Sequence, residues 1–315
     1  MDVLDTSAVL TVAVRAARVA GARIRSFTGG APVLKVKADF QDLVTATDRD
    51  CQDDIQKVIR EAFGEAHLFL GEEDVPPGAE ASAAAIAAVL ARGKPVWVVD
   101  PIDGTTNFAS GLPISCVSIG VADATGSVVV GVIYDPHRDE LFHAVRGGGA
   151  FLNGAPMRVA AVTELRASLW GWGLHHARHV GKTMLRAADT FADEVRGLRG
   201  LGSAVRFSRA APHGHREAGP SLSPPTAQAI ELAYVACGRL AGFFEFELCA
   251  WDLAAGSLLV EEAGGRVTGP AGQPYNLALR DVLASCGPIH DGAMALLVKA
   301  GATKADDPAL WPPLH

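Results

Sequence analysis

The chain contains few cysteines for its 315 residues, and those it has show no pairing pattern. The five are scattered and odd in number, and no two have the CxxC spacing of a zinc or redox site. Such usage is typical of free thiols in a reducing compartment rather than of a secreted disulfide framework. We therefore expect a cytoplasmic protein. The cysteines are Cys51, Cys116, Cys237, Cys249 and Cys286.

Long apolar runs and a basic leader are also missing. No stretch approaches the roughly 20 apolar residues of a membrane span. The segment Met1 to Asp5 carries acids where a signal peptide would carry bases. Positive charge is in deficit, because the net charge is −7 at pH 7. An acidic, soluble chain gives no reason to expect a nucleic acid or an anionic membrane as partner.

Apolar residues, in contrast, are abundant, at 49% of the chain against 20% for charged residues. This composition can bury a sizeable core, and the length suits one large domain or two packed lobes. The pattern changes near Met157, from a β-rich meander to alternating strands and helices. We therefore predict an N-terminal α+β lobe over residues 1–155 and a C-terminal α/β lobe over residues 156–315.

Apolar periodicity and turn residues indicate the individual elements. In the first lobe, helices are predicted at residues 7–26, 47–63 and 79–91. Strands are predicted at residues 67–70, 95–99, 116–122, 128–134 and 141–145. In the second lobe, helices are predicted at residues 181–195, 230–237 and 253–263. The first two strands both end in acids, which makes their ends candidate sites.

The interval 205–228 differs from the rest of the second lobe. It holds four prolines together with arginines and histidines, which indicates a long loop inside an otherwise compact lobe. Loops longer than about 12–15 residues are uncommon and tend to be functional or disordered. A tolerated surface insertion is the preferred interpretation.

The densest group of candidate ligands is the segment from Asp100 to Thr106. A buried strand reaches Asp100, and Pro101 then forbids further ladder pairing. Across that turn Asp100 and Asp103 can point into one space, with the carbonyl of Ile102 between them. The simpler alternative for such a segment is a turn with a helix cap.

The residues that follow add a place for an anion. Gly104 permits a close approach or an unusual backbone conformation. Thr105 and Thr106 can start a helix, whose first N–H groups then face outward. Hard oxygen ligands beside such a helix end favour magnesium or calcium, together with a phosphate. A bound magnesium ion neutralises phosphate charge and lowers the pKa of a water molecule.

Two more acids occupy comparable positions. Glu72 follows the predicted strand at residues 67–70, and Asp252 precedes the predicted helix at residues 253–263. Taken alone, Glu72 reads as a solvated loop acid and Asp252 as the N-cap of its helix. Spacing along the chain does not show whether these acids meet Asp100.

Four segments, in this order, resemble motifs of the inositol monophosphatase family. They are Asp42–Asp48 (DLVTATD), Gly71–Glu73 (GEE), Trp97–Phe108 (WVVDPIDGTTNF) and Trp251–Gly256 (WDLAAG). The resemblance covers most of the chain and implies a layered α/β/α/β/α sandwich of the inositol monophosphatase and fructose-1,6-bisphosphatase type. It also implies a homodimer and a magnesium-dependent, lithium-sensitive phosphatase.

The resemblance assigns the metal site residue by residue. Two or three Mg²⁺ ions are expected on the residues that match the family's ligands, namely Glu72, Asp100, Asp103, Asp252 and the carbonyl of Ile102. Glu72, Asp100 and Thr105 form the expected catalytic group, in which Thr105 with Glu72 activates the attacking water. The N–H groups of Gly104 and Thr105 are expected to hold the phosphate.

Further residues match the family's supporting and substrate-side positions. The supporting residues are Lys37, expected near the mouth of the site, Asp48, expected to support the residues and water around the metal ions, and Glu73. The substrate-side residues are Glu245, which is expected to contact a hydroxyl, and Ser203 and Ala204, which are expected to line the alcohol ring. The insertion at 205–228 begins beside Ser203 and Ala204, and therefore bears on which alcohol is accepted.

Three functions follow from these residues. The first is hydrolysis of a small polyol or sugar phosphate, with inositol 1-phosphate as the default. The second is a related phosphatase acting on fructose 1,6-bisphosphate or on a 3′(2′),5′-bisphosphate nucleotide, with Arg206, Arg209 and Arg216 as candidate contacts for the second phosphate. The third is a non-catalytic accessory partner of the transcription machinery.

Overall fold

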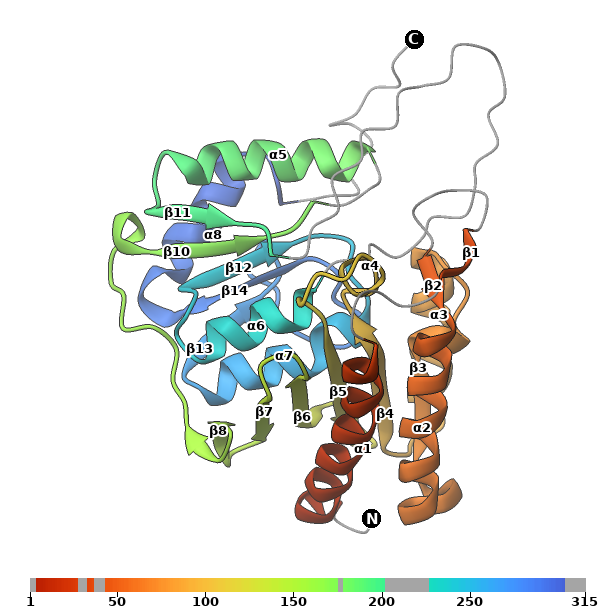
Figure 1. Ribbon diagram of the computed structural model, residues 1–315. Helices are drawn as coiled ribbons and strands as arrows, with labels where there is room; N and C mark the ends of the chain where they lie inside the picture. The colour runs from red at the N-terminus through yellow and green to blue at the C-terminus, as the bar shows by residue number, and fades with distance from the viewer. Residues whose placement is uncertain (1–3, 28–32, 37–42, 175–177, 202–226, 304–315) are drawn as a thin grey trace.

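The computed structural model describes residues 4–27, 33–36, 43–174, 178–201 and 227–303. Within them, two sheets alternate with three layers of helices (Figure 1). The order helix, sheet, helix, sheet, helix is the α+β layered sandwich that the resemblance implies. A separate two-stranded ribbon joins β1 (Val33–Val36) and β2 (Leu43–Thr45). None of the described helices is long and apolar enough to cross a membrane.

The first sheet has seven strands in chain order, from β3 to β9. Its strands are β3 (Leu68–Gly71), β4 (Val96–Asp103), β5 (Cys116–Ala122), β6 (Val128–Asp135), β7 (Glu140–Val145), β8 (Gly149–Leu152) and β9 (Ala155–Pro156). β3 and β4 are parallel and the remaining neighbours are antiparallel. The five strands predicted for the first lobe are therefore present.

One predicted strand end is wrong. β4 does not stop at Asp100, because Asp103 pairs with Cys116 of β5 after an irregularity between Asp100 and Asp103. Pro101 lacks an N–H group and interrupts the ladder, but a local bulge lets the strand resume. The two acids are therefore held on one strand rather than on a free turn.

Two helices cover the outer face of this sheet, α1 (Thr6–Ser26) and α2 (Ala46–Phe63). Asp5 caps α1 by accepting hydrogen bonds from the N–H groups of Ser7 and Ala8. Side chains of β4 alternate between the two faces. Trp97 and Val99 join the core under α1 and α2, whereas Val96 and Val98 join the middle core. Asp100, next in the second series, is thereby directed toward the middle layer.

The middle layer contains α6 (Gln228–Ala236) and α7 (Ala250–Glu262). Small residues let α7 lie close to the first sheet. A Cβ atom on Gly120 would lie 2.5 Å from the Cβ atom of Ala254, and one on Gly131 would lie 2.7 Å from the carbonyl oxygen of Ala255. This close approach brings the first turn of α7 to the end of β4. The helix α3 (Ala79–Leu90) borders the same core.

The second sheet has the order β11-β10-β12-β14-β13. Its strands are β10 (Leu169–Trp172), β11 (Gly197–Arg199), β12 (Gly242–Glu245), β13 (Gly265–Thr268) and β14 (Val282–Cys286). The helices α5 (Arg178–Ala192) and α8 (His290–Lys299) cover its outer face and enclose the third core. The short helices are α4 (Thr105–Ala109), η1 (Gly64–Ala66), η2 (Glu72–Asp74), η3 (Leu165–Ala167) and η4 (Gly287–Ile289).

Three helices of the second lobe begin earlier than predicted. α5 begins at Arg178, α6 at Gln228 and α7 at Ala250, which is two or three residues before the expected starts. Helix ends are the least certain part of a periodicity reading because a first turn needs few apolar residues. The predicted insertion 205–228 therefore ends at Ala227 at the latest, and most of it lies outside the described residues.

Candidate active site

Three buried carboxylates meet where the first sheet and the middle layer touch. Asp100, Asp103 and Asp252 each offer an oxygen atom, and these atoms all lie within 4.8 Å of one another. Their residues are at most 5% exposed. Asp100 and Asp103 come from β4, and Asp252 comes from the first turn of α7. The fold thus brings together acids that are about 150 positions apart along the chain.

Glu72 joins this cluster because β3 runs parallel to β4. Leu70 and Gly71 pair with Val98 and Val99, so Glu72 emerges next to Asp100. The carboxyl groups of Glu72 and Asp100 lie close enough for each to change the pKa of the other. The loop-acid interpretation of Glu72 is therefore set aside, since its side chain lies against the other acids.

Crowding of the carboxyl groups changes their proton affinities. Burial, followed by repulsion from the neighbouring carboxylates, raises the pKa values of Glu72, Asp100 and Asp103 well above their usual range. Burial also raises the pKa of Asp252 to about 7. Four acids held this way disfavour their charged forms, and a cation placed among them removes that penalty. The donor set therefore fits a divalent metal ion.

Asp103 is held by the first turn of α6. Its Oδ1 atom accepts a hydrogen bond from the Gln228 N–H at 3.2 Å, and its Oδ2 atom accepts one from the Ala229 N–H at 2.8 Å. The Cys116 thiol also donates to Oδ2, at 3.4 Å. The sequence interpretation missed these partners, because it started the helix at Ile230. An earlier helix start would have revealed two free N–H groups.

Asp252 is not the N-cap that its position suggested. Cys249 occupies the cap, and Asp252 lies three residues later, where its Oδ2 atom accepts the Cys249 N–H at 2.7 Å. The cap is therefore reciprocal, a capping box built from a cysteine and an aspartate. Ser118 of β5 donates to the carbonyl of Trp251 at 3.0 Å and ties this turn to the first sheet.

Gly104 and Thr105 follow directly on β4. Gly104 has φ 92°, and a Cβ atom there would lie 2.8 Å from the carbonyl oxygen of Ile114. Thr105 begins α4, and its hydroxyl lies 3.0 Å from the carbonyl oxygen of Ile102 and 3.2 Å from Oδ1 of Asp48. Thr105 thus lies between Asp48 and the Ile102 carbonyl, which was predicted from the sequence to be a metal ligand.

The helix α2 supports the segment that carries Glu72. Gln52, buried on α2, accepts a hydrogen bond from the Glu73 N–H at 3.1 Å. Its amide lies against Gly71, where a Cβ atom would be 2.1 Å from Oε1 of Gln52. Arg49 donates to the Glu73 carbonyl. Gln52 was missed by the sequence analysis, although a polar residue on the buried face of a predicted helix is a usable signal.

Glu245 is the last residue of β12 and is fully buried. Its carboxylate lies over Gly173, where a Cβ atom would be 1.9 Å from Oε2 of Glu245. Lys37, Ser203 and Ala204 lie outside the described residues, as do Arg206, Arg209 and Arg216.

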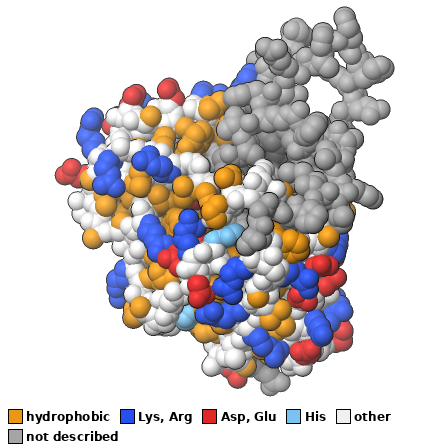
Figure 2. Space-filling view, in the orientation of Figure 1, with side chains coloured by type: hydrophobic (Ala, Val, Ile, Leu, Met, Phe, Trp, Pro, Cys, Tyr) orange, Lys and Arg blue, Asp and Glu red, His pale blue; other side chains and the backbone are white. Residues whose placement is uncertain are grey.

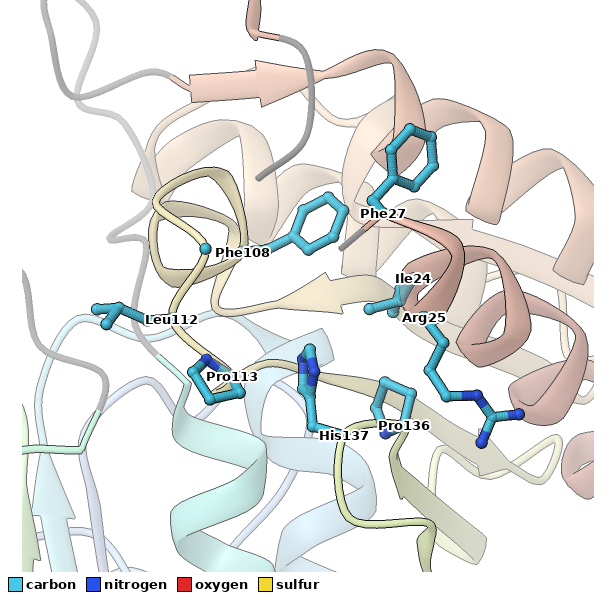
Figure 3. Close-up of a pocket in the computed structure, with 9 residues that line it drawn as sticks. Ile24, Arg25, Phe27, Phe108, Leu112, Pro113, Pro136 and His137 are labelled. Atoms are coloured by element: carbon cyan, nitrogen blue, oxygen red, sulfur yellow. The ribbon is translucent and has the colours of Figure 1, made fainter. Parts of the chain in front are cut away.

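A separate cavity of about 450 Å³ lies between α4 and the end of α1 (Figure 3). Phe108, Leu112 and Pro113 line it from the chain after Thr105, and Ile24 and Phe27 line it from the end of α1. The His137 ring points into it, whereas the Arg25 guanidinium points away and bonds to the hydroxyl of Tyr134. Because its lining is mostly apolar and has no acid among the described residues, this cavity is distinct from the carboxylate cluster.

Comparison with known proteins agrees with this geometry. The profile of the "Inositol monophosphatase family" matches residues 5–302. Inositol monophosphatase 3 of Solanum lycopersicum is 36% identical over 291 residues, covering 91% of this chain and 96% of the relative. Inositol-1-monophosphatase of Mesorhizobium japonicum is 36% identical over 265 residues, covering 83% and 85%.

Solved structures give the same answer. The inositol monophosphatase of Anabaena (Nostoc) sp. PCC 7120 superposes with a TM-score of 0.71 at 31% identity, covering 94% of this chain and 97% of that one. Thermotoga maritima IMPase TM1415 superposes with a TM-score of 0.71 at 29% identity, covering 96% and 98%. Both the sequence and the fold match over nearly the full length of these relatives. The chain therefore belongs to the inositol monophosphatase family of phosphoric monoester hydrolases.

Proposed function

We propose that this protein hydrolyses the phosphate monoester of a small polyol, with inositol 1-phosphate as the first candidate, and that it uses Mg²⁺. The observation that carries the proposal is the convergence of Asp100, Asp103 and Asp252 beside Glu72. Several relatives carry inositol monophosphatase in their names, which supports inositol phosphate as the default substrate.

The chemistry of the donor set supports magnesium. Asp100, Asp103, Asp252, Glu72 and the Ile102 carbonyl offer hard oxygen atoms, and no His or other nitrogen donor joins the described cluster. When bound, Mg²⁺ supplies charge neutralisation at the phosphate and lowers the pKa of a water molecule. We propose that these five groups hold two or three such ions.

The remaining chemistry falls to the protein's own groups. Glu72 is proposed to accept the proton of the attacking water, and the Thr105 hydroxyl, itself positioned by Asp48 and Ile102, is proposed to orient that water. The N–H groups of Gly104 and Thr105 are proposed to hold the phosphate. Glu245 is proposed to receive a hydroxyl of the leaving alcohol, a role supported by its burial at the end of β12.

The wider expectations remain part of this proposal. We expect a homodimer, inhibition by lithium and a cytoplasmic location. The five free cysteines support a reducing compartment. On the face shown in Figure 2, acidic and basic side chains are interspersed, which fits a small-molecule substrate better than nucleic acid.

The test is a panel of phosphate esters assayed with purified protein. Inositol 1-phosphate should release phosphate with Mg²⁺, and EDTA or lithium should suppress the reaction. Fructose 1,6-bisphosphate and 3′-phosphoadenosine 5′-phosphate complete the panel and would reveal a bisphosphatase. Asp100→Asn should abolish turnover, because one metal-binding oxygen is lost. Circular dichroism should show that this variant keeps the wild-type fold. A fully active Asp100→Asn protein would refute the mechanism.

A further inference from the structure

The turn that joins Glu245 to Asp252 has an unusual backbone. Glu247, in the middle of this connection between β12 and α7, has φ 62°. The other non-glycine residues with positive φ in the described chain are Asp139 and Asn153, types that tolerate this region. Glutamate has no comparable preference, so its surroundings must hold it there.

Arg280 and Asp281, which directly precede β14, provide that support. We call the three residues Glu247, Arg280 and Asp281 the Glu247 clamp. Arg280 Nη2 donates to the carbonyl oxygen of Glu247 at 3.0 Å and to its Oε2 atom at 2.9 Å. Asp281 Oδ1 accepts the Glu247 N–H at 2.9 Å. The Leu248 N–H donates to the Arg280 carbonyl at 2.8 Å. Both backbone groups of Glu247 and the N–H of Leu248 are thereby hydrogen-bonded.

Arg280 maintains this clamp at an energetic cost. Its side chain is 24% exposed, and its Nε and Nη1 atoms are buried without a hydrogen-bond partner in the part of the chain that the structure describes. An unsatisfied buried donor destabilises the fold, because it has given up its hydrogen bonds to water without replacing them. Strain and cost of this kind concentrate at functional sites.

The clamp lies between two groups of the candidate site. Glu245, one residue before the turn, pairs with Val282, one residue after Asp281. Asp252 follows the turn in the first helical turn of α7. We propose that Arg280 is a positioning residue for the alcohol side of the site, because it fixes the Glu247 turn and so keeps Glu245 in place relative to Asp252. This inference rests on the proposed function.

The test uses two substrates and a rescue. Inositol 1-phosphate offers hydroxyls to Glu245, whereas 4-nitrophenyl phosphate has none on its leaving group. Arg280→Met should raise KM for inositol 1-phosphate at least fivefold, with kcat within twofold, and should leave 4-nitrophenyl phosphate within twofold. Glu247→Gly should change neither, because glycine adopts positive φ without strain. The double variant should return KM to within twofold of wild type.

Other outcomes separate the possible failures. Equal loss on both substrates, or a double variant no better than Arg280→Met, would overturn the positioning role and indicate an effect of charge or folding. If Arg280→Met does not fold, Arg280→Lys keeps the charge but loses the fork that spans two acceptors. An unchanged KM in that variant also overturns the role. If the wild-type protein hydrolyses neither ester, both the proposed function and the inference are contradicted. If the wild-type protein is active and Arg280→Met has the same KM for inositol 1-phosphate, the inference alone is contradicted.

Discussion

At the scale of single residues, Gly104 has two separate reasons to be glycine. Its φ of 92° is strained for any residue with a Cβ atom. A Cβ atom would also lie 2.8 Å from the Ile114 carbonyl oxygen and 3.2 Å from the Cβ atom of Ala227. The second contact matters because Ala227 directly precedes the turn that holds Asp103. Strain at Gly104 therefore transmits to the carboxylate cluster.

We predict that Gly104→Ala lowers kcat/KM on the order of 100-fold, because small displacements of catalytic groups cost that much. Gly126→Ala is the matched control, since Gly126 has φ 87° in a hairpin turn and faces only the flexible end of Leu90. Both variants should lose about 1 kcal/mol of stability from backbone strain. Steady-state kinetics and urea unfolding measure the two effects, and equal activities in the two variants would contradict the prediction.

At the scale of elements, the start of α6 acts as a support for a ligand. Its first two N–H groups bind the two oxygens of Asp103, which lies on a strand of the first sheet. A helix N-terminus favours negative charge, so these two hydrogen bonds lower the pKa of Asp103 and oppose, without cancelling, the burial that raises it. The support is a property of the backbone rather than of the Gln228 side chain.

Replacing Gln228 by proline separates this support from the helix itself. Proline is tolerated at the first position of a helix, but it lacks the N–H that donates to Asp103. We predict that Gln228→Pro raises the Mg²⁺ concentration for half-maximal activity several-fold and changes the unfolding free energy by less than about 1 kcal/mol. Gln228→Ala keeps the N–H and should need less additional Mg²⁺ than Gln228→Pro. A magnesium titration of phosphate release measures this, and identical titrations for the two variants would argue against the support.

The helices and strands also show how much of the fold could be predicted from the sequence alone. The five strands predicted for the first lobe and the acids near the strand ends followed from apolar alternation, which is a local signal, whereas the layered fold was implied by the family resemblance. Local signals did not predict that β4 resumes after Pro101, since that depends on a partner strand reaching Cys116. They also misplaced the start of α6, and with it Gln228 and Ala229.

The convergence of the acids is a different kind of limit. Glu72, Asp100 and Asp252 meet because β3 pairs with β4 and because Gly120 and Gly131 admit α7 closely. Both contacts belong to the tertiary structure and do not follow from the spacing of residues along the chain, so only the family resemblance could predict them. The roles of Lys37, Ser203 and Ala204 stay predictions, because these residues lie outside the described chain.

At the scale of the whole molecule, the acid cluster opposes folding when no cation is bound. When folding raises the pKa of a carboxyl group, the folded protein becomes less stable as the pH rises above the pKa that this group has in the unfolded chain. The reason is that the group is then charged in the unfolded chain, whereas the fold disfavours its charge.

We predict that Asp100→Asn stabilises the metal-free protein by about 1–3 kcal/mol at pH 7. Saturating Mg²⁺ should reduce or reverse the difference, since it binds the wild-type fold better. Urea unfolding in EDTA and in Mg²⁺ measures this, with exposed Asp53→Asn as control; a less stable variant in EDTA would contradict it.

A buried histidine gives the opposite pH dependence. His290 is fully buried between the hydroxyls of Ser285 and Thr268, at 2.8 and 2.9 Å. Burial lowers its pKa from 6.5 to about 4. Its contribution to stability is complete above pH 6.5 and is lost as pH falls toward 4, because the unfolded chain binds the proton first.

We predict that wild type loses about 2 kcal/mol more stability than His290→Gln between pH 8 and pH 5, as this pKa difference requires. Urea unfolding of both proteins at the two pH values isolates the effect, because the carboxyl cluster is common to them. Parallel losses in wild type and variant would contradict the assignment.

The candidate site draws its ligands from both sides of the connection between the two sheets. Asp100 and Asp103 precede it and Asp252 follows it, as do the two N–H groups that hold Asp103. The affinity for a metal ion and the association of the two sheets are therefore linked quantities. If the chain were cut after the exposed Thr163, Mg²⁺ would drive the two fragments together, and enzymatic activity would become a sensor of their reassembly.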